Sequence, residues 1–220
     1  MSKVILMKKY IFSISVYSAI FSFLAITTLA TILAIDYDFV SETISGLGKS
    51  NQKYSWLLVL TGITYSTLIQ GLTPLLYFSS KSIGAKITNT SLVVIYGITS
   101  LLTSIFKIGN YNYIIGSFSE DRVHEILARV SFYSIWILIA LSPITLKGNN
   151  QFTLPKTFSL ILTPLVFTTG IIFEFNLHLE YRGLYQRFLF IIVMIWIILA
   201  TKACQKQFSK RFKSKGDSNE

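Results

Sequence analysis

Three short polar segments contain the side chains whose types and spacing could do chemistry. They contribute, in chain order, Asp38, Ser41 and Ser45, then Asp121 and His124, then His178 and Arg187. On a helix, Asp121 lies one turn before His124, where a carboxylate can fix the tautomer of an imidazole and raise its basicity. That arrangement suits a metal ligand, a proton carrier or a structural hydrogen bond.

Metal-dependent hydrolysis near lipid head groups is one function that these residues allow. His124, His178 and Asp121 could supply three zinc ligands, and Asp38 or Glu42 could act as the base toward metal-bound water. The ligand set is small, because the sequence has two histidines, one cysteine and no His-Glu-x-x-His pattern. The carboxylate–histidine pair could instead carry protons in a small ion-coupled transporter.

A binding, sensing or assembly role requires the fewest specific residues, and it is the function we predict. In this reading the polar segments line a pocket or hold helices together. Arg187 is expected at the start of a helix, where the dipole is unfavourable for a cation, so an acidic group or an anion should compensate it. No phosphate loop, nucleophile elbow, haem motif or cofactor fingerprint is present, so whether the protein is an enzyme and which cofactor it uses stay open.

The elements that must position these residues are strongly apolar. The chain is 52% hydrophobic and only 14% charged, whereas a soluble domain is about a quarter charged. A membrane span needs roughly 20 mostly apolar residues, and its backbone groups must be paired within the segment. We therefore predict an all-α polytopic bundle of about six transmembrane helices, at Ile11–Ile35, Tyr54–Phe78, Thr90–Phe106, Ile126–Leu146, Thr157–Phe175 and Phe188–Thr201.

Details within these segments lead to further expectations. Residues 1–204 should form one membrane domain, and the basic tail 205–220 should be disordered after its first turn or two. Gln70, followed by Gly71, predicts a kink in the second span. Asp38 should cap a short amphipathic helix that begins at Phe39. Arg129 lies inside the fourth span, where a charge is normally paired, and we predict an ion pair with Glu174.

The charges predict the sidedness of the protein. With the N-terminus inside, thirteen of the twenty lysines and arginines fall on the inner side, and six of these lie between Lys202 and Lys215. Such a bias places both termini in the cytoplasm of a multi-pass cell-membrane protein, with its basic tail against anionic lipid. Eight of the ten acidic residues and both histidines fall outside. The basic residues flank apolar segments, so nucleic acid is not an expected partner.

The same segments resemble a known family of prokaryotic membrane proteins. The resemblance rests on Asp38-x-x-Ser41-x-x-x-Ser45-x-Leu47-Gly48, on Asp121-x-x-His124 and on Gly183-Leu184-x-x-Arg187, in this order along six spans. The family is catalogued as domain of unknown function 998, and the resemblance covers nearly the whole chain. It implies a six-span membrane fold and supplies no activity.

Overall fold

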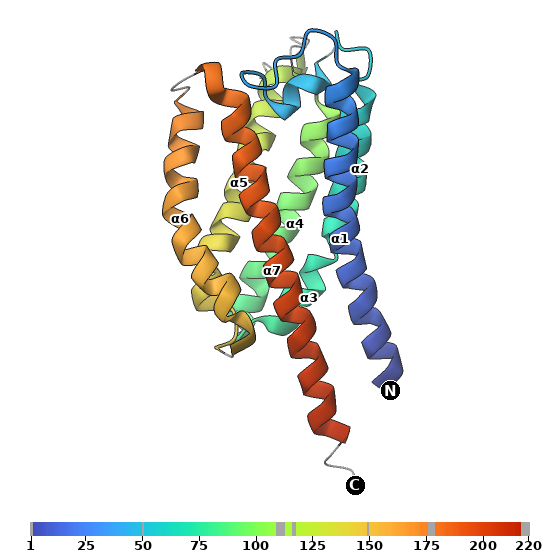
Figure 1. The fold of residues 1–220 in the computed structure, drawn as a ribbon, viewed down its shortest axis with the longest axis vertical. Coiled ribbons are helices and arrows are strands. Elements are labelled where there is room, and N and C mark those ends of the chain that lie inside the picture. The colour runs from blue at the N-terminus through green and yellow to red at the C-terminus, as the bar shows by residue number, and fades with distance from the viewer. Residues whose placement is uncertain are drawn as a thin grey trace.

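The computed structural model describes residues 2–49, 51–108, 113–115, 118–148, 150–175 and 179–216. It is a bundle of long helices whose N- and C-termini lie at the same end (Figure 1). The elements are α1 (Ser2–Leu33), the 3-10 helix η1 (Ile44–Gly48), α2 (Trp56–Ile69), α3 (Leu72–Ser79), α4 (Ile83–Ile105), the strands β1 (Tyr113–Ile115) and β2 (Phe118–Ser119), α5 (Glu120–Thr145), η2 (Asn150–Phe152), α6 (Thr153–Glu174), η3 (Leu179–Tyr181) and α7 (Arg182–Gly216).

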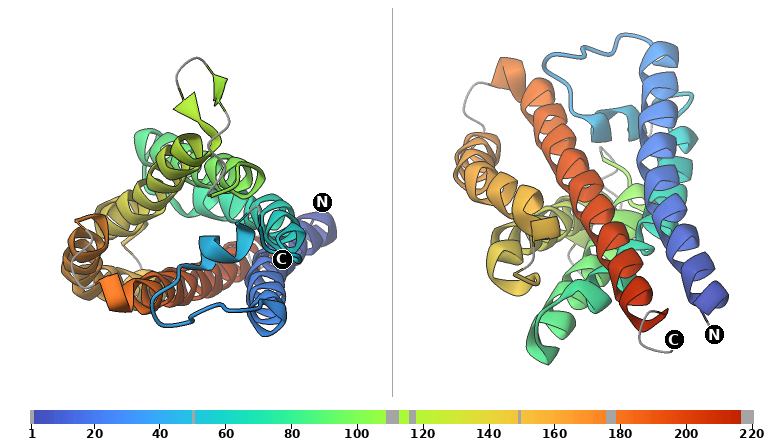
Figure 2. Two further views of the ribbon diagram at one scale, coloured as in Figure 1. Left: turned by 90° about the horizontal axis from the view of Figure 1, so that it is seen from above. Right: turned by 60° about the horizontal axis from the view of Figure 1, so that its bottom comes forward.

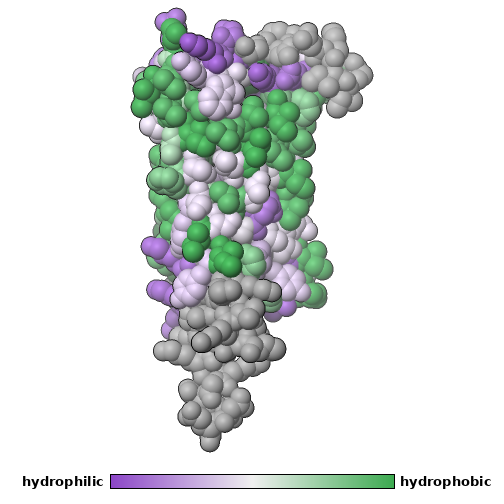
Figure 3. Space-filling view, turned by 90° about the vertical axis from the view of Figure 1, so that its right-hand side faces the viewer, coloured by the Kyte–Doolittle hydropathy of each residue, from purple (hydrophilic) through white to green (hydrophobic). Residues whose placement is uncertain are grey.

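Six helical segments of the described chain are long and apolar enough to cross a membrane, which confirms the predicted fold class. The third and sixth extend beyond the apolar runs seen in the sequence, to Ile83–Ile105 and Leu179–Gln207. Large apolar side chains such as Phe21 and Ile32 face outward, with more than 70% of their surface exposed. Figure 3 shows such apolar residues on one face, between hydrophilic side chains at the top and others near the lower end. Lipid is the solvent that suits this face.

The last helix is the most buried of the six spans. In the most apolar 18-residue stretch of each span, 56% of the stretch is buried in α7 and 28% in α4. Trp196 of α7 is fully buried, and its indole Nε1 donates to Ser159 Oγ at 2.7 Å. Ser159 also bonds Ser142 Oγ at 2.6 Å, so one hydroxyl network joins α5, α6 and α7. A satisfied network of this kind fixes the helices relative to one another where lipid offers no partners.

The second span is broken where the sequence predicts a kink, between α2 and α3. Gln70 and Gly71 keep helical dihedral angles, but the Gly71 amide bonds Leu68 O at 3.1 Å, three residues back. Ser15 of α1 donates its hydroxyl to the same carbonyl at 2.6 Å. A Cβ on Gly71 would lie 2.6 Å from Phe12 O, so only glycine lets α1 approach this closely. The kink is therefore a tight turn held by the neighbouring helix.

Two turns are joined near the end of the bundle that carries the chain termini, which we call the terminal end. The Lys81 amide donates to Thr145 O at 3.0 Å, and the Lys147 amide donates to Ser79 O at 3.2 Å. These bonds flank an isolated β-bridge between Ser80 and Leu146. These hydrogen bonds therefore tie the α3–α4 turn to the segment after α5.

The basic tail differs in part from its expected form. The structure continues α7 as a helix to Gly216, where we expected disorder soon after Gln205. Lysine, arginine and glutamine have good helix propensity, so a helix that leaves the membrane continues into such a sequence. The division of the chain at residue 204 stays a prediction.

Candidate functional site

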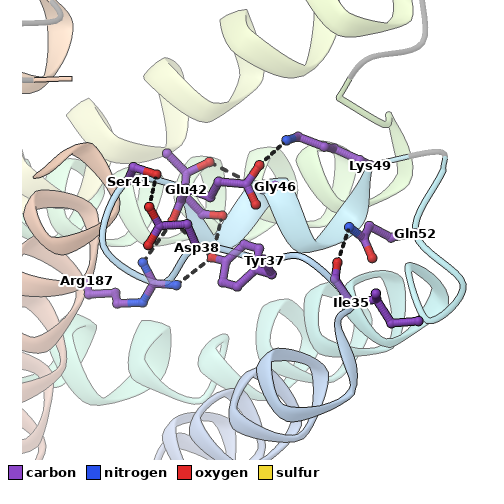
Figure 4. Close-up of polar contacts among 10 residues, drawn as sticks. Ile35, Tyr37, Asp38, Ser41, Glu42, Gly46, Lys49, Gln52 and Arg187 are labelled. Atoms are coloured by element: carbon purple, nitrogen blue, oxygen red, sulfur yellow. Dashed lines mark hydrogen bonds and ion pairs between the residues drawn. The ribbon is translucent and has the colours of Figure 1, made fainter. Parts of the chain in front are cut away.

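The first polar segment crosses the end of the bundle opposite the termini, which we call the η1 end. In the view from above, η1 lies across the ring of helices (Figure 2). The chain turns at Asp36, a non-glycine residue with a positive φ of 55°. Asp38 then accepts hydrogen bonds from the Val40 amide at 2.9 Å and the Ser41 hydroxyl at 2.6 Å (Figure 4). The segment is thus a turn stabilised by its own aspartate.

The prediction of a helix that begins at Phe39 and is capped by Asp38 was wrong in both its start and its cap. The structure forms only η1, from Ile44 to Gly48, and Thr43 is its N-cap through a bond from the Gly46 amide at 3.3 Å. Asp38 bonds the backbone two residues on, and such local bonds compete with helix formation. The Ser41 hydroxyl and the Val40 amide lower the pKa of the exposed Asp38 carboxyl, because both donate to its ionised form.

The third polar segment anchors the first. Arg187 of α7 donates to Phe39 O at 2.9 Å and to Glu42 O at 3.0 Å, and it also bonds the Tyr37 hydroxyl (Figure 4). Its guanidinium stacks over the Phe39 ring, 3.9 Å from the centroid. Carbonyl oxygens and aromatic faces therefore contact Arg187 directly, and the Asp38 carboxylate interacts with it electrostatically, as expected for an acidic group that compensates it.

Gly183 and Leu184 complete this anchor. A Cβ on Gly183 would lie 2.3 Å from Glu42 O, so a side chain there would push the segment away from α7. The Leu184 amide donates to Val40 O at 3.1 Å, and Gln186 accepts from the Ile44 amide at 2.6 Å. The spacing of the motif Gly-Leu-x-x-Arg therefore has a structural reason: all three residues lie within about one turn of α7 and contact the same loop.

Tyr37 lies in the middle of the anchor, and the sequence did not single it out. Its hydroxyl contacts Glu42 O at 3.0 Å and Thr43 O at 2.8 Å. Burial raises the pKa of Tyr37, although the bond and the charge from Arg187 act in the opposite direction. A neutral phenol is therefore the form that holds the loop. A tyrosine between two aspartates was the one available signal, and it is a weak one.

A cavity of about 610 Å³ lies beneath this anchored segment. Its lining comes from the η1 segment and from α1, α2, α4, α5, α6 and α7. The polar part includes Ser41, Glu42, Ser45, Lys49, Thr61, Tyr65, Tyr96, Ser100, Thr103, Ser104, Lys107, Asp121, His124, Glu125, Arg129, Ser131, Glu174, Arg182 and Gln186, and the apolar part includes Phe23, Phe132, Ile135, Leu189, Phe190 and Val193. Such volumes are typical of small-molecule sites. Asp38 and Arg187 are outside this lining and hold its roof.

The second polar segment supplies one wall of the cavity. Asp121, His124, Ala128 and Ser131 all line it, as expected for residues on one face of a helix. Ser119 caps this helix by accepting from the Arg122 amide at 3.3 Å.

His124 is the most enclosed titratable group of that wall, with 6% of its surface exposed. Its Nδ1 lies 2.7 Å from Phe106 O. A carbonyl can only accept, so Nδ1 carries a proton and, in the neutral ring, Nε2 is an acceptor. The Phe106 carbonyl thus fixes the tautomer, a role that we had assigned to Asp121.

Hydroxyl pairs link the helices deeper in the cavity. The Tyr65 and Tyr96 hydroxyls are 2.7 Å apart, and those of Ser100 and Ser131 are 2.6 Å apart. Both tyrosines are only 3% exposed. Their place in the site depends on packing between α2, α4 and α5, so sequence spacing gave no indication of it.

The expected ion pair between Arg129 and Glu174 is present at the edge of the cavity. Arg129 Nε lies 2.8 Å from Glu174 Oε1, and a longer contact of 3.8 Å reaches Glu125. The side chains are 40% and 35% exposed, so the pair contributes little more than about 0.5 kcal/mol to stability. Its main effect is to join α5 to α6 beside the cavity.

The proposed metal ligands do not form a group among the residues that the structure describes. No cluster of three or more histidine, cysteine, aspartate or glutamate side chains suited to a metal ion occurs there. His124 and Asp121 are in the cavity wall, and His178 lies outside the described residues.

Six spans around a roofed cavity define a multi-pass helical membrane protein. Within this class, residues 18–202 match the model of the family described as protein of unknown function DUF998, and the chain belongs to that family. The match runs from within the first span to within the last, and it contains all three polar segments. No curated protein and no solved structure matches the chain.

Proposed function

We propose that this protein binds an amphipathic, lipid-like molecule in the cavity at the η1 end. The observation that carries the proposal is the division of the cavity wall. Charged groups such as Asp121 and Lys49 line it near η1, and Phe23, Phe190 and Val193 line it within the spans. A molecule with a polar head and an apolar tail matches both parts.

The roof supports a binding role more than a purely structural one. Residues 37–46 are held to α7 by Arg187, Leu184 and Gln186 and cover the cavity. A loop that only connected two spans would not need so many bonds to a helix some 140 residues away. Its position favours a site that is closed over its ligand.

The two alternatives have less support. A metal-dependent hydrolase would need a ligand group, and the described residues do not contain one. A transporter would gain support from unwound helices at mid-membrane. The broken second span is a tight helical turn whose Leu68 carbonyl is already occupied by Ser15, so it offers no such ion site.

Lipid bound to purified protein tests the proposal. Ala128→Phe places a ring in the cavity, and Ala25→Phe adds the same ring to the exposed face of α1 as a matched control. Native mass spectrometry in detergent should show a bound lipid on the wild type and on Ala25→Phe, and at least a tenfold lower occupancy on Ala128→Phe. Equal occupancy in all three proteins, or none on the wild type, would remove the proposal.

Sidedness remains part of the same proposal. The acidic residues whose side chains the structure describes belong to the segments around the η1 end, whereas Lys81, Lys147, Lys156 and Lys202 belong to segments at the terminal end. This pattern favours a cell membrane with the terminal end in the cytoplasm, where anionic lipid would meet the basic tail. A cysteine introduced at exposed Asn51, near the η1 end, should react with an impermeant maleimide in intact cells, and one introduced at exposed Gly84, near the terminal end, should not. The reverse labelling would invert the orientation.

A further inference from the structure

His124 presents a hydrogen-bond acceptor in the wall of the cavity. The side chain is more than nine-tenths buried, and it lines the cavity. Nδ1 donates to Phe106 O at 2.7 Å, so in the neutral ring Nε2 is the atom that can accept a hydrogen bond. A donor on a bound molecule would replace the water that Nε2 loses when the cavity is filled. The group that meets His124 should therefore donate a hydrogen bond.

We infer that the ligand is a lipid with an uncharged, hydroxyl-bearing head group, such as a glycosyl diacylglycerol, and that one of its hydroxyls donates to His124 Nε2. This inference rests on the proposed function and names the class of molecule that the cavity takes. Its grounds are the acceptor on His124, the balance of charge around it and the hydroxyl pairs below it.

The charge of the cavity favours a neutral head group. The carboxylates in its lining are Glu42, Asp121, Glu125 and Glu174, and the same number of lysines and arginines lines it. Glu42 is paired with Lys49, and Glu174 with Arg129. The wall therefore has no surplus of either sign for a phosphate or for an ammonium group. In addition, a phosphate diester has only acceptors, so the lone pair of Nε2 would repel it.

The hydroxyl pairs are suited to a polyol. In the Tyr65–Tyr96 pair, one hydroxyl donates to the other, which leaves one phenolic proton without a partner within the pair. The Ser100–Ser131 pair, with oxygens 2.6 Å apart, keeps lone pairs that can accept. A sugar or glycerol hydroxyl both donates and accepts, so it can satisfy both kinds of group. A choline group can do neither.

A comparison of lipids that share the same acyl chains tests the inference on the wild type. The full chain is purified in an amine-oxide detergent, so that no glycoside detergent competes. Binding of monoglucosyl diacylglycerol, phosphatidylglycerol and phosphatidylcholine is then measured by native mass spectrometry. We expect the glucolipid to bind at least tenfold more tightly than either phospholipid. Tighter binding of a phospholipid would overturn the inference and leave the proposed function intact, whereas no binding of any lipid would overturn both.

Two variants at His124 separate a ligand contact from a structural role. Asparagine places an amide N–H near the position of Nδ1 and keeps the bond to Phe106 O, but it has no acceptor at the position of Nε2. Glutamine reaches that position with an amide oxygen. His124→Asn should weaken glucolipid binding about fivefold to tenfold, the value of one neutral hydrogen bond, and His124→Gln should restore most of it. Wild-type affinity in His124→Asn would refute the contact, and the lipid comparison decides the inference if this variant does not fold.

Discussion

Replacing Gly183 by alanine should release the roof of the cavity from α7. The new Cβ would lie 2.3 Å from Glu42 O and 2.7 Å from Val40 O, and both are backbone atoms that cannot rotate away. Contacts under 3.0 Å essentially never occur for real Cβ atoms. The segment must therefore move, and the bond from the Leu184 amide to Val40 O is the first to be lost.

The size of the effect follows from the bonds at risk. One neutral hydrogen bond contributes about 1 kcal/mol, and each bond from the Arg187 guanidinium to a carbonyl contributes about 1.5 kcal/mol at the lower end of its range. Loss of the Leu184 bond and of one or both Arg187 bonds thus favours the open loop by about 2.5–4 kcal/mol. Each 1.4 kcal/mol is about tenfold, so the open population should rise by about two to three powers of ten.

Hydrogen exchange measures this opening directly. In Gly183→Ala, the amides of Glu42, Ile44 and Gly46 should exchange faster, because each donates within the roof segment or to α7. Gly84→Ala is a matched control: Gly84 is also the second residue of its helix, and a Cβ there meets nothing within 4 Å. If peptides over 38–48 exchange in Gly183→Ala as they do in Gly84→Ala, the reasoning about the anchor is refuted.

Three further changes test other parts of the structure. Ser159→Ala leaves the buried indole N–H of Trp196 without its acceptor and should destabilise the protein by about 1–3 kcal/mol in a tryptophan-fluorescence melt; an unchanged melting temperature would contradict the network. Gly71→Ala places a Cβ 2.6 Å from Phe12 O and should lower the melting temperature by several degrees relative to Gly84→Ala, whereas equal values would show that α1 can shift without cost. Ser41→Ala removes the main cause of the low Asp38 pKa, so an NMR titration of the carboxyl carbon should show a higher value. Because the ionised form favours the folded turn, this stabilisation is present above the unfolded pKa of about 4 and is lost as pH falls through the lower, folded pKa.

Much of the fold follows from the sequence because the bilayer leaves few choices. Six apolar runs must be helices, since lipid offers their backbone no partners, and all six are present in the structure. The kink at Gln70 and the pairing of Arg129 with Glu174 also follow from local rules, namely a glycine within a span and a charge that needs a partner. The face formed by Asp121, His124, Ala128 and Ser131 follows from helical spacing alone.

Tertiary structure decided what these residues do. Arg187 and Asp38 looked like site residues, but α7 and the first loop come together so that both hold a roof. Tyr65 and Tyr96 looked like ordinary span residues, and packing placed them in the cavity wall. The physical reason is that sequence periodicity fixes which side of a helix a residue occupies. Only the packing of the helices fixes which other side chain or backbone carbonyl it meets there. The tautomer of His124, set by the carbonyl of Phe106 at the end of α4, depends on that packing.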